Sequence, residues 1–131
     1  MAKHIFISHS WDKNSAYKNL TALLDGRKYF TWEDHSVPRT NRIHTTKSSI
    51  IEIEIANRIR NSDCVLIIAS MEVAYSDWLQ WEIFVSQIYR KPIIGIIPRG
   101  AQRIPTIVRD ASSIEVVHWN TKSIINAIRN I

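Results

Sequence analysis

Short apolar runs alternate along the chain with longer amphipathic segments. Runs rich in Ile and Val lie at residues 3–8, 64–70, 92–98 and 114–119. Such runs are typical of strands that are buried on both faces of a parallel sheet. Residues 28–32 form a further, weaker strand candidate. The apolar pattern therefore predicts five strands.

Segments with helical spacing separate these strands. They span residues 12–26, 46–63, 75–91 and 120–131. The first of them ends at Gly26, a residue type that commonly stops a helix. Residues 98–113 are poorly patterned, and we expect a loop there with one short helical turn. This alternation of strands and helices predicts a doubly wound α/β layer with right-handed crossovers.

Length and composition fit one globular domain over residues 1–131. The chain is 45% hydrophobic and 22% charged, close to the globular average. The apolar run near the N-terminus is too short for a signal peptide or a membrane span, so we expect a soluble, cytoplasmic protein. The net charge is +5, but the basic residues are dispersed, which argues against a nucleic-acid partner. The short apolar run likewise leads us to expect no membrane partner. The basic residues can still attract an anionic small molecule.

Several chemistries are excluded by the residues present. The chain has 3 glycines, none in a phosphate-binding loop motif. Its 5 histidines show no helical pair and no companion cysteine, so we predict no metal site. Cys64 lies in an apolar run and is expected to be a buried, unreactive thiol.

The helix predicted at residues 75–91 carries the most informative polar residue. On a helical wheel one wide apolar arc forms, with Glu82 on its edge. The arc consists of Trp78, Trp81, Phe84, Val85, Ile88 and Tyr89. In doubly wound sheets ligands bind beyond the carboxyl ends of the strands, and this helix follows the third strand. A desolvated carboxylate there indicates a functional cleft. The alternative is a surface glutamate that complements the helix dipole while the tryptophans pack the core.

Four segments together resemble a known family. They read HIFISHSWDK (residues 4–13), YFTWEDHSVP (29–38), SDCVLIIAS (62–70) and SDWLQWEIF (76–84). They are similar to the boxes of TIR domains, and among these to the TIR-like ThsB proteins of the Thoeris bacterial anti-phage system. The most specific feature is the spacing of four between Trp78 and Glu82, directly after a strand that ends in Ser.

The resemblance implies a fold and an activity. The fold is flavodoxin-like, a five-stranded parallel sheet in the order 2-1-3-4-5 with helices on both faces. The activity is that of an NAD nucleosidase or ADP-ribosyl cyclase with Glu82 as the catalytic residue and NAD as the substrate, without a further cofactor. The expected product is a cyclic or rearranged ADP-ribose that activates a separate downstream effector. Self-association through TIR contacts and a phage-derived trigger are also implied.

The same resemblance suggests which side chains contact NAD. Ser8, His9 and Ser70 are expected to line the pocket, and Asp34 to contact the nucleotide. Trp32 or Trp78 would stack on the nicotinamide ring, and Arg39 or Arg42 would meet the diphosphate. Two alternatives remain open at this point. The first is a non-enzymatic TIR adaptor that self-associates through residues 35–47, and the second is an enzyme similar to nucleoside deoxyribosyltransferases.

Overall fold

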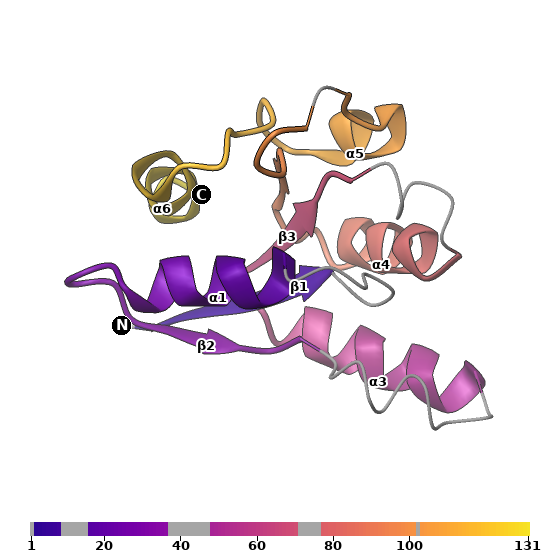
Figure 1. Ribbon diagram of the computed structural model, residues 1–131. Helices are drawn as coiled ribbons and strands as arrows, with labels where there is room; N and C mark the ends of the chain where they lie inside the picture. Colours follow the sequence, from indigo (N-terminus) through magenta and orange to yellow (C-terminus); the bar gives the residue numbers. More distant parts are fainter. Residues whose placement is uncertain (1, 9–15, 37–47, 71–76, 102) are drawn as a thin grey trace.

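The computed structural model describes residues 2–8, 16–36, 48–70, 77–101 and 103–131 (Figure 1). The strands are β1 (Lys3–Ser8), β2 (Trp32–Asp34), β3 (Cys64–Ile68) and β4 (Ile93–Ile96). The helices are α1 (Ala16–Asp25), α3 (Ser48–Arg60), α4 (Asp77–Ile88), α5 (Thr106–Ala111) and α6 (Thr121–Arg129). The helices therefore lie where helical spacing predicted them, and α5 replaces the single helical turn expected at residues 98–113. Within the described ranges, no helix combines the length and the apolarity that a membrane span needs.

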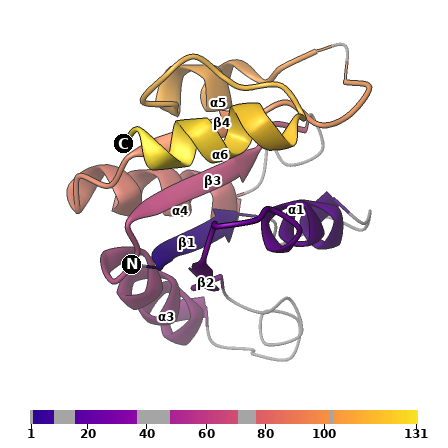
Figure 2. The ribbon, with the colours of Figure 1, turned by 90° about the vertical axis from the view of Figure 1, so that its left-hand side faces the viewer.

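The described strands form one parallel sheet in the order β2-β1-β3-β4. The sheet is covered on both faces, with α1 and α6 on one side and α3 and α4 on the other (Figure 2). Ile5 and Ile7 of β1 point to the α1/α6 side, and Phe6 points to the α3/α4 side, as strand alternation requires. We call the apolar cluster under α1 and α6 the first core and the cluster under α3, α4 and α5 the second core.

The prediction of a fifth strand is wrong. Residues 114–119 contribute one isolated parallel bridge, between Ile96 and Val117. The adjoining part of β4 is bonded by serine side chains instead: the Ile93 amide donates to Ser113 Oγ at 2.9 Å, and the Gly95 amide donates to Ser112 Oγ at 3.0 Å. These hydroxyls accept the hydrogen bonds that the β4 amides would otherwise donate to a fifth strand.

The second strand lies later in the chain than its apolar pattern predicted. It was expected at residues 28–32, and it begins at Trp32. Tyr29 has a φ of 63°, and the Phe30 amide donates to the Arg27 carbonyl at 3.4 Å, so the chain is still turning there. As a result, Asp34 lies within the strand rather than in the loop after it.

Candidate functional site

Glu82 lies in the middle of the buried face of α4. Its exposed fraction is 0%, and Leu79 and Ser86, which lie one turn away on the same face, are also buried, as is the next residue, Ile83. The helical wheel placed Glu82 at the edge of the apolar arc and predicted that this arc faces the core. That prediction was wrong about which side of α4 packs against the rest of the protein. Phe84 and other members of the arc are at the surface instead. Their exposed fractions are 52% for Phe84, 58% for Ile88 and 40% for Tyr89.

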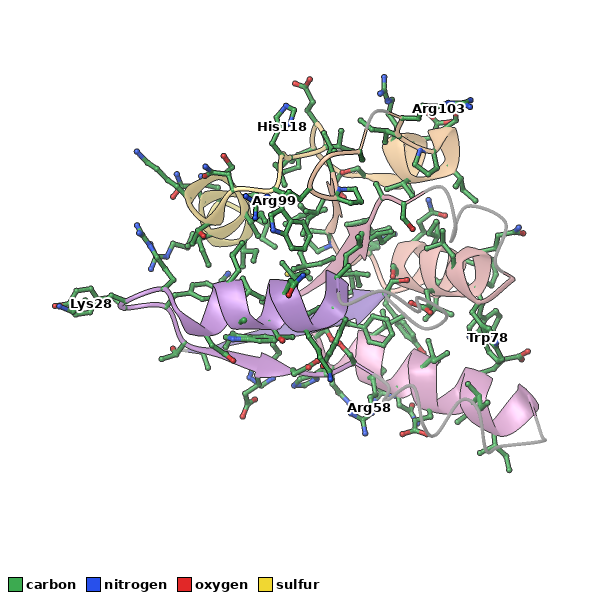
Figure 3. The ribbon with its side chains drawn as sticks, viewed as in Figure 1. Lys28, Arg58, Trp78, Arg99, Arg103 and His118 are labelled. Atoms are coloured by element: carbon green, nitrogen blue, oxygen red, sulfur yellow. The ribbon has the colours of Figure 1, made fainter. Side chains whose placement is uncertain are left out.

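Contacts with α3 explain this orientation. The indole N–H of Trp81 donates to the carbonyl of Glu52 on α3 at 3.3 Å, and Trp78 packs against the second core. In Figure 3, Trp78 lies between α4 and α3. The burial of Glu82 rules out the alternative of a surface glutamate, because such a side chain would keep its carboxylate in water.

Two serines lie at the carboxyl ends of the central strands. Ser8 ends β1, is 6% exposed, and alternates with Phe6 onto the sheet face that α3 and α4 cover. Ser70 follows β3, and its amide donates to the Ile68 carbonyl at 2.9 Å. The Ser70 hydroxyl is buried and has no hydrogen-bond partner in the described part of the chain. Buried hydroxyls are normally bonded, so a ligand group is one explanation for this one.

Trp32 does not belong to this group. It pairs with Lys3 at the amino end of β1, and Ser8 lies five residues further along, roughly 16 Å away at the usual strand rise. Its indole N–H donates to Asp25 Oδ1 at 2.7 Å, and its ring packs against the first core. The expectation that Trp32 stacks on a ligand at the carboxyl edge is therefore corrected: it fastens β2 to α1.

Asp34 is likewise engaged by neighbouring elements. Its carboxylate accepts a hydrogen bond from the Tyr17 hydroxyl of α1 and another from the Ser36 amide, the latter at 2.9 Å. Burial, followed by the contact with Asp34, raises the pKa of Tyr17, which keeps the phenol protonated as a donor. Asp34 thus orients α1 and the end of β2. The remaining expected contact residues, His9, Arg39 and Arg42, lie outside the described residues.

Cys64 is fully buried at the start of β3. Burial raises the pKa of its thiol to about 12, so the thiolate is not available near neutral pH. Nucleophilic catalysis by this cysteine is thereby excluded, as the apolar run around it predicted.

A separate group of polar residues lies between β2 and α3. Glu33, Asp34 and His35 line a surface cavity of about 570 Å³ together with Asn57, Arg58 and Asn61. His4 and His35 both approach Glu33 there. The sequence analysis looked for helical histidine pairs and cysteine companions, and so missed this cluster. The cluster forms because the parallel register sets His4 opposite Glu33, and the sequence alone does not reveal that register.

Comparison with family models gives a match over residues 6–103 to the TIR-like domain of the Thoeris protein ThsB. The matched region includes the second half of β1, all of β3 and the helix that carries Glu82. The chain belongs to the ThsB TIR-like family. No curated protein matches the sequence.

Two solved structures share the fold at low sequence identity. The CMP N-glycosidase BcmB of Clostridium botulinum superimposes with a TM-score of 0.60 at 14% identity, over 98% of this chain and 100% of that one. A 2-deoxyribosyltransferase of the psychrotolerant bacterium Bacillus psychrosaccharolyticus also gives a TM-score of 0.60, at 17% identity over 94% of this chain and 90% of that one. At such identities the likeness concerns the fold of this ThsB-family chain.

Proposed function

We propose that this ThsB-family protein cleaves the bond between nicotinamide and ribose in NAD and releases a cyclic or rearranged ADP-ribose. The observation that carries the proposal is the position of Glu82. It is a fully buried carboxylate, four residues after the half-buried Trp78, on the helix that follows the central strand β3. The product would serve as the signal that activates a separate effector in anti-phage defence.

One carboxylate is sufficient for this reaction. Most glycosidases use two, because a leaving oxygen that would otherwise depart as an anion must be protonated while the oxocarbenium-like transition state is stabilised. The nicotinamide nitrogen of NAD is already cationic and leaves as a neutral molecule, so the acid is unnecessary. Glu82 would hydrogen-bond the ribose hydroxyls and stabilise the positive charge that develops at the anomeric carbon.

The burial of Glu82 supports this role. A carboxylate removed from water acts more strongly on a developing charge, because the surroundings screen it less. Burial of a carboxylate also costs free energy, and ionisable groups that are held out of water concentrate at functional sites. Exclusion of water would favour capture of the cation by the adenine or ribose of the same molecule, which gives a cyclic product.

Other residues near the carboxyl edge would position the substrate. The partly buried ring of Trp78 offers a surface for stacking the nicotinamide, and the buried Ser70 hydroxyl has hydrogen-bonding capacity for a substrate oxygen. Ser8 presents a second buried hydroxyl at the end of β1. Contacts of His9 with the pocket, and of Arg39 with the diphosphate, remain predictions.

A second candidate substrate class has its own support. One of the similar structures described above is named a CMP N-glycosidase, and another is a 2-deoxyribosyltransferase described as a suitable biocatalyst for the synthesis of nucleosides. The same fold therefore accommodates reactions at a sugar–base bond. A nucleoside or nucleotide would meet the same Glu82, but its neutral base would need a proton in order to leave, which the cationic nicotinamide does not.

The test is a mass-spectrometric assay of NAD, CMP and deoxynucleosides with wild type and two variants. Glu82→Gln removes the charge and keeps the shape, and Glu115→Gln is the matched control because Glu115 is exposed. We expect wild type and Glu115→Gln to release nicotinamide, and Glu82→Gln to be slower by at least about 100-fold, the usual effect of removing one stabilising group. The assay is run at low and at high protein concentration, and also in lysate of phage-infected cells.

Each outcome has a distinct meaning. Turnover of CMP or deoxynucleosides without loss of NAD would show that the substrate is a nucleoside or nucleotide rather than NAD. The proposed catalytic role of Glu82 would then be kept. If no substrate is consumed under any condition and Glu82→Gln retains anti-phage defence, the adaptor alternative becomes the better account. In that case, substitutions of Arg39 or Arg42 should break self-association while Glu82→Gln does not.

A further inference from the structure

Three potential metal ligands converge at the outer edge of the sheet. His4 of β1 and Glu33 of β2 are partners in the parallel register, and the His35 amide donates to the Ile5 carbonyl at 2.8 Å, which extends the pairing past β2. His4 Nε2 lies 3.2 Å from Glu33 Oε2, and His35 Nε2 lies 3.8 Å from the same oxygen. One ligand atom from each residue can be chosen so that all lie within 4.8 Å of one another.

We propose that His4, Glu33 and His35 form a binding site for a divalent cation of the zinc class. Zinc binds imidazole nitrogen and carboxylate oxygen at roughly 2.0–2.2 Å, so two ligand atoms of a tetrahedral ion lie about 3.3 Å apart. The two distances to the Glu33 oxygen, 3.2 and 3.8 Å, are close to that separation. Two histidines with one carboxylate are also an established set of three protein ligands for zinc.

Simple ion pairing explains the cluster less well. The two imidazole rings are 4.7 Å apart between centroids, inclined at 55°. If both were protonated to pair with Glu33, two positive charges would lie side by side against one carboxylate. A metal ion instead uses both rings in their neutral form and places the single positive centre between them.

An ion can reach the three side chains from solvent, and neighbouring residues hold the ligands in place. The side chains of His4, Glu33 and His35 are 40%, 60% and 21% exposed, so an ion can enter without opening the core. The His4 amide donates to Asp63 Oδ2 at 2.8 Å, which fixes the backbone at that ligand. Glu33 and His35 also line the cavity of about 570 Å³, so a further ligand, such as water, can complete the coordination from there.

The nearest basic side chain on the cavity wall is already engaged. Arg58 donates to the Ser36 carbonyl at 3.2 Å and to Glu54 Oε1 at 3.4 Å. These bonds direct the guanidinium to α3 and to the end of β2. The negative charge of Glu54 partly offsets the positive charge of Arg58, which weakens the repulsion of a bound cation.

Calorimetric titration of tag-free, chelator-treated protein with Zn²⁺ tests the site. We compare wild type with His4→Gln, Glu33→Gln and His35→Gln. His118→Gln is the matched control, because His118 is an exposed histidine on the opposite side of the molecule from Arg58 (Figure 3). Wild type and the control are expected to bind one Zn²⁺ per chain. Each cluster variant should bind at least about tenfold more weakly, since even second-shell changes commonly have that effect.

The visible spectrum with Co²⁺ provides a second readout. A tetrahedral site gives an intense absorption band, which wild type should show and the cluster variants should lose. Binding that is equally strong in all three cluster variants would overturn the proposal, and so would the absence of saturable binding to the folded wild type. Circular dichroism of each variant establishes folding. None of these readouts depends on NAD turnover.

Discussion

The two faces of the sheet are buried by cores of different character. The first core, under α1 and α6, is built from apolar side chains such as Leu24, Leu66 and Ile124. The α3/α4 side also encloses Glu82 and Ser86, both with 0% exposure. Burying apolar surface stabilises the fold, whereas burying a carboxylate opposes it. The first core therefore supplies stability, whereas the α3/α4 face also holds a carboxyl group out of water, which carries a cost in desolvation.

Truncation of a first-core residue should therefore have the largest effect on stability. Leu66 is fully buried in the central strand β3, so Leu66→Ala should lower the free energy of unfolding by about 3 kcal/mol, within the 2–5 kcal/mol usual for such changes. Urea denaturation followed by circular dichroism measures the change. Leu66→Met, which nearly conserves volume, is the control and should lose less than about 1.5 kcal/mol. A loss below about 1 kcal/mol in Leu66→Ala would mean that the first core is loosely packed.

The three strands β1, β3 and β4, which contribute side chains to both cores, were the easiest part of the fold to predict. β1, β3 and β4 are buried on both faces, so each appears in the sequence as an almost uninterrupted apolar run. The edge strand β2 is short and largely exposed, and it leaves no such run. Residues 114–119 do have the apolar pattern of a strand. They form no strand because Ser112 and Ser113 accept hydrogen bonds from β4 amides in place of a fifth strand, and no local pattern reveals these bonds.

The candidate site was predictable only in part, for a related reason. The spacing of Trp78 and Glu82 identified the glutamate, because spacing is a property of the sequence. The side of α4 that packs against the sheet was not predictable, since apolar residues such as Phe84 surround the helix and its docking on α3 decides which of them are buried. The approach of His4 and His35 to Glu33 depends on strand register, which a single sequence leaves open.

The buried thiol of the first core makes the stability of the protein depend on pH. The pKa of Cys64 is raised from 9.0 to about 12 in the folded protein. Above pH 9 the thiol of the unfolded chain therefore loses its proton before the folded one does, which favours unfolding. This contribution is complete below pH 9 and disappears as the pH rises towards 12.

Comparison of wild type with Cys64→Val isolates that effect, because all other titrating groups are shared. Relative to the variant, wild type should lose about 1 kcal/mol of unfolding free energy between pH 8 and pH 10. Urea midpoints at the two pH values measure the difference. If the unfolding free energies of the two proteins change in parallel with pH, burial does not raise the pKa of the Cys64 thiol, and the thiol is more accessible to water than in this structure.

The smallest expected change in stability concerns the second core and tests the comparison most directly. Glu82→Gln keeps the shape of the side chain and removes the buried charge, so the desolvation penalty falls. We expect the variant to unfold at the same temperature as wild type or slightly above it, with a gain below about 1 kcal/mol. Differential scanning calorimetry measures this, with Glu115→Gln at the surface as the control. A loss of more than about 1 kcal/mol in Glu82→Gln alone would contradict this desolvation cost, because the carboxylate would then stabilise the fold. An unchanged or higher melting temperature combined with lost NAD turnover would instead separate the two roles, since the glutamate would be needed for the reaction and not for folding.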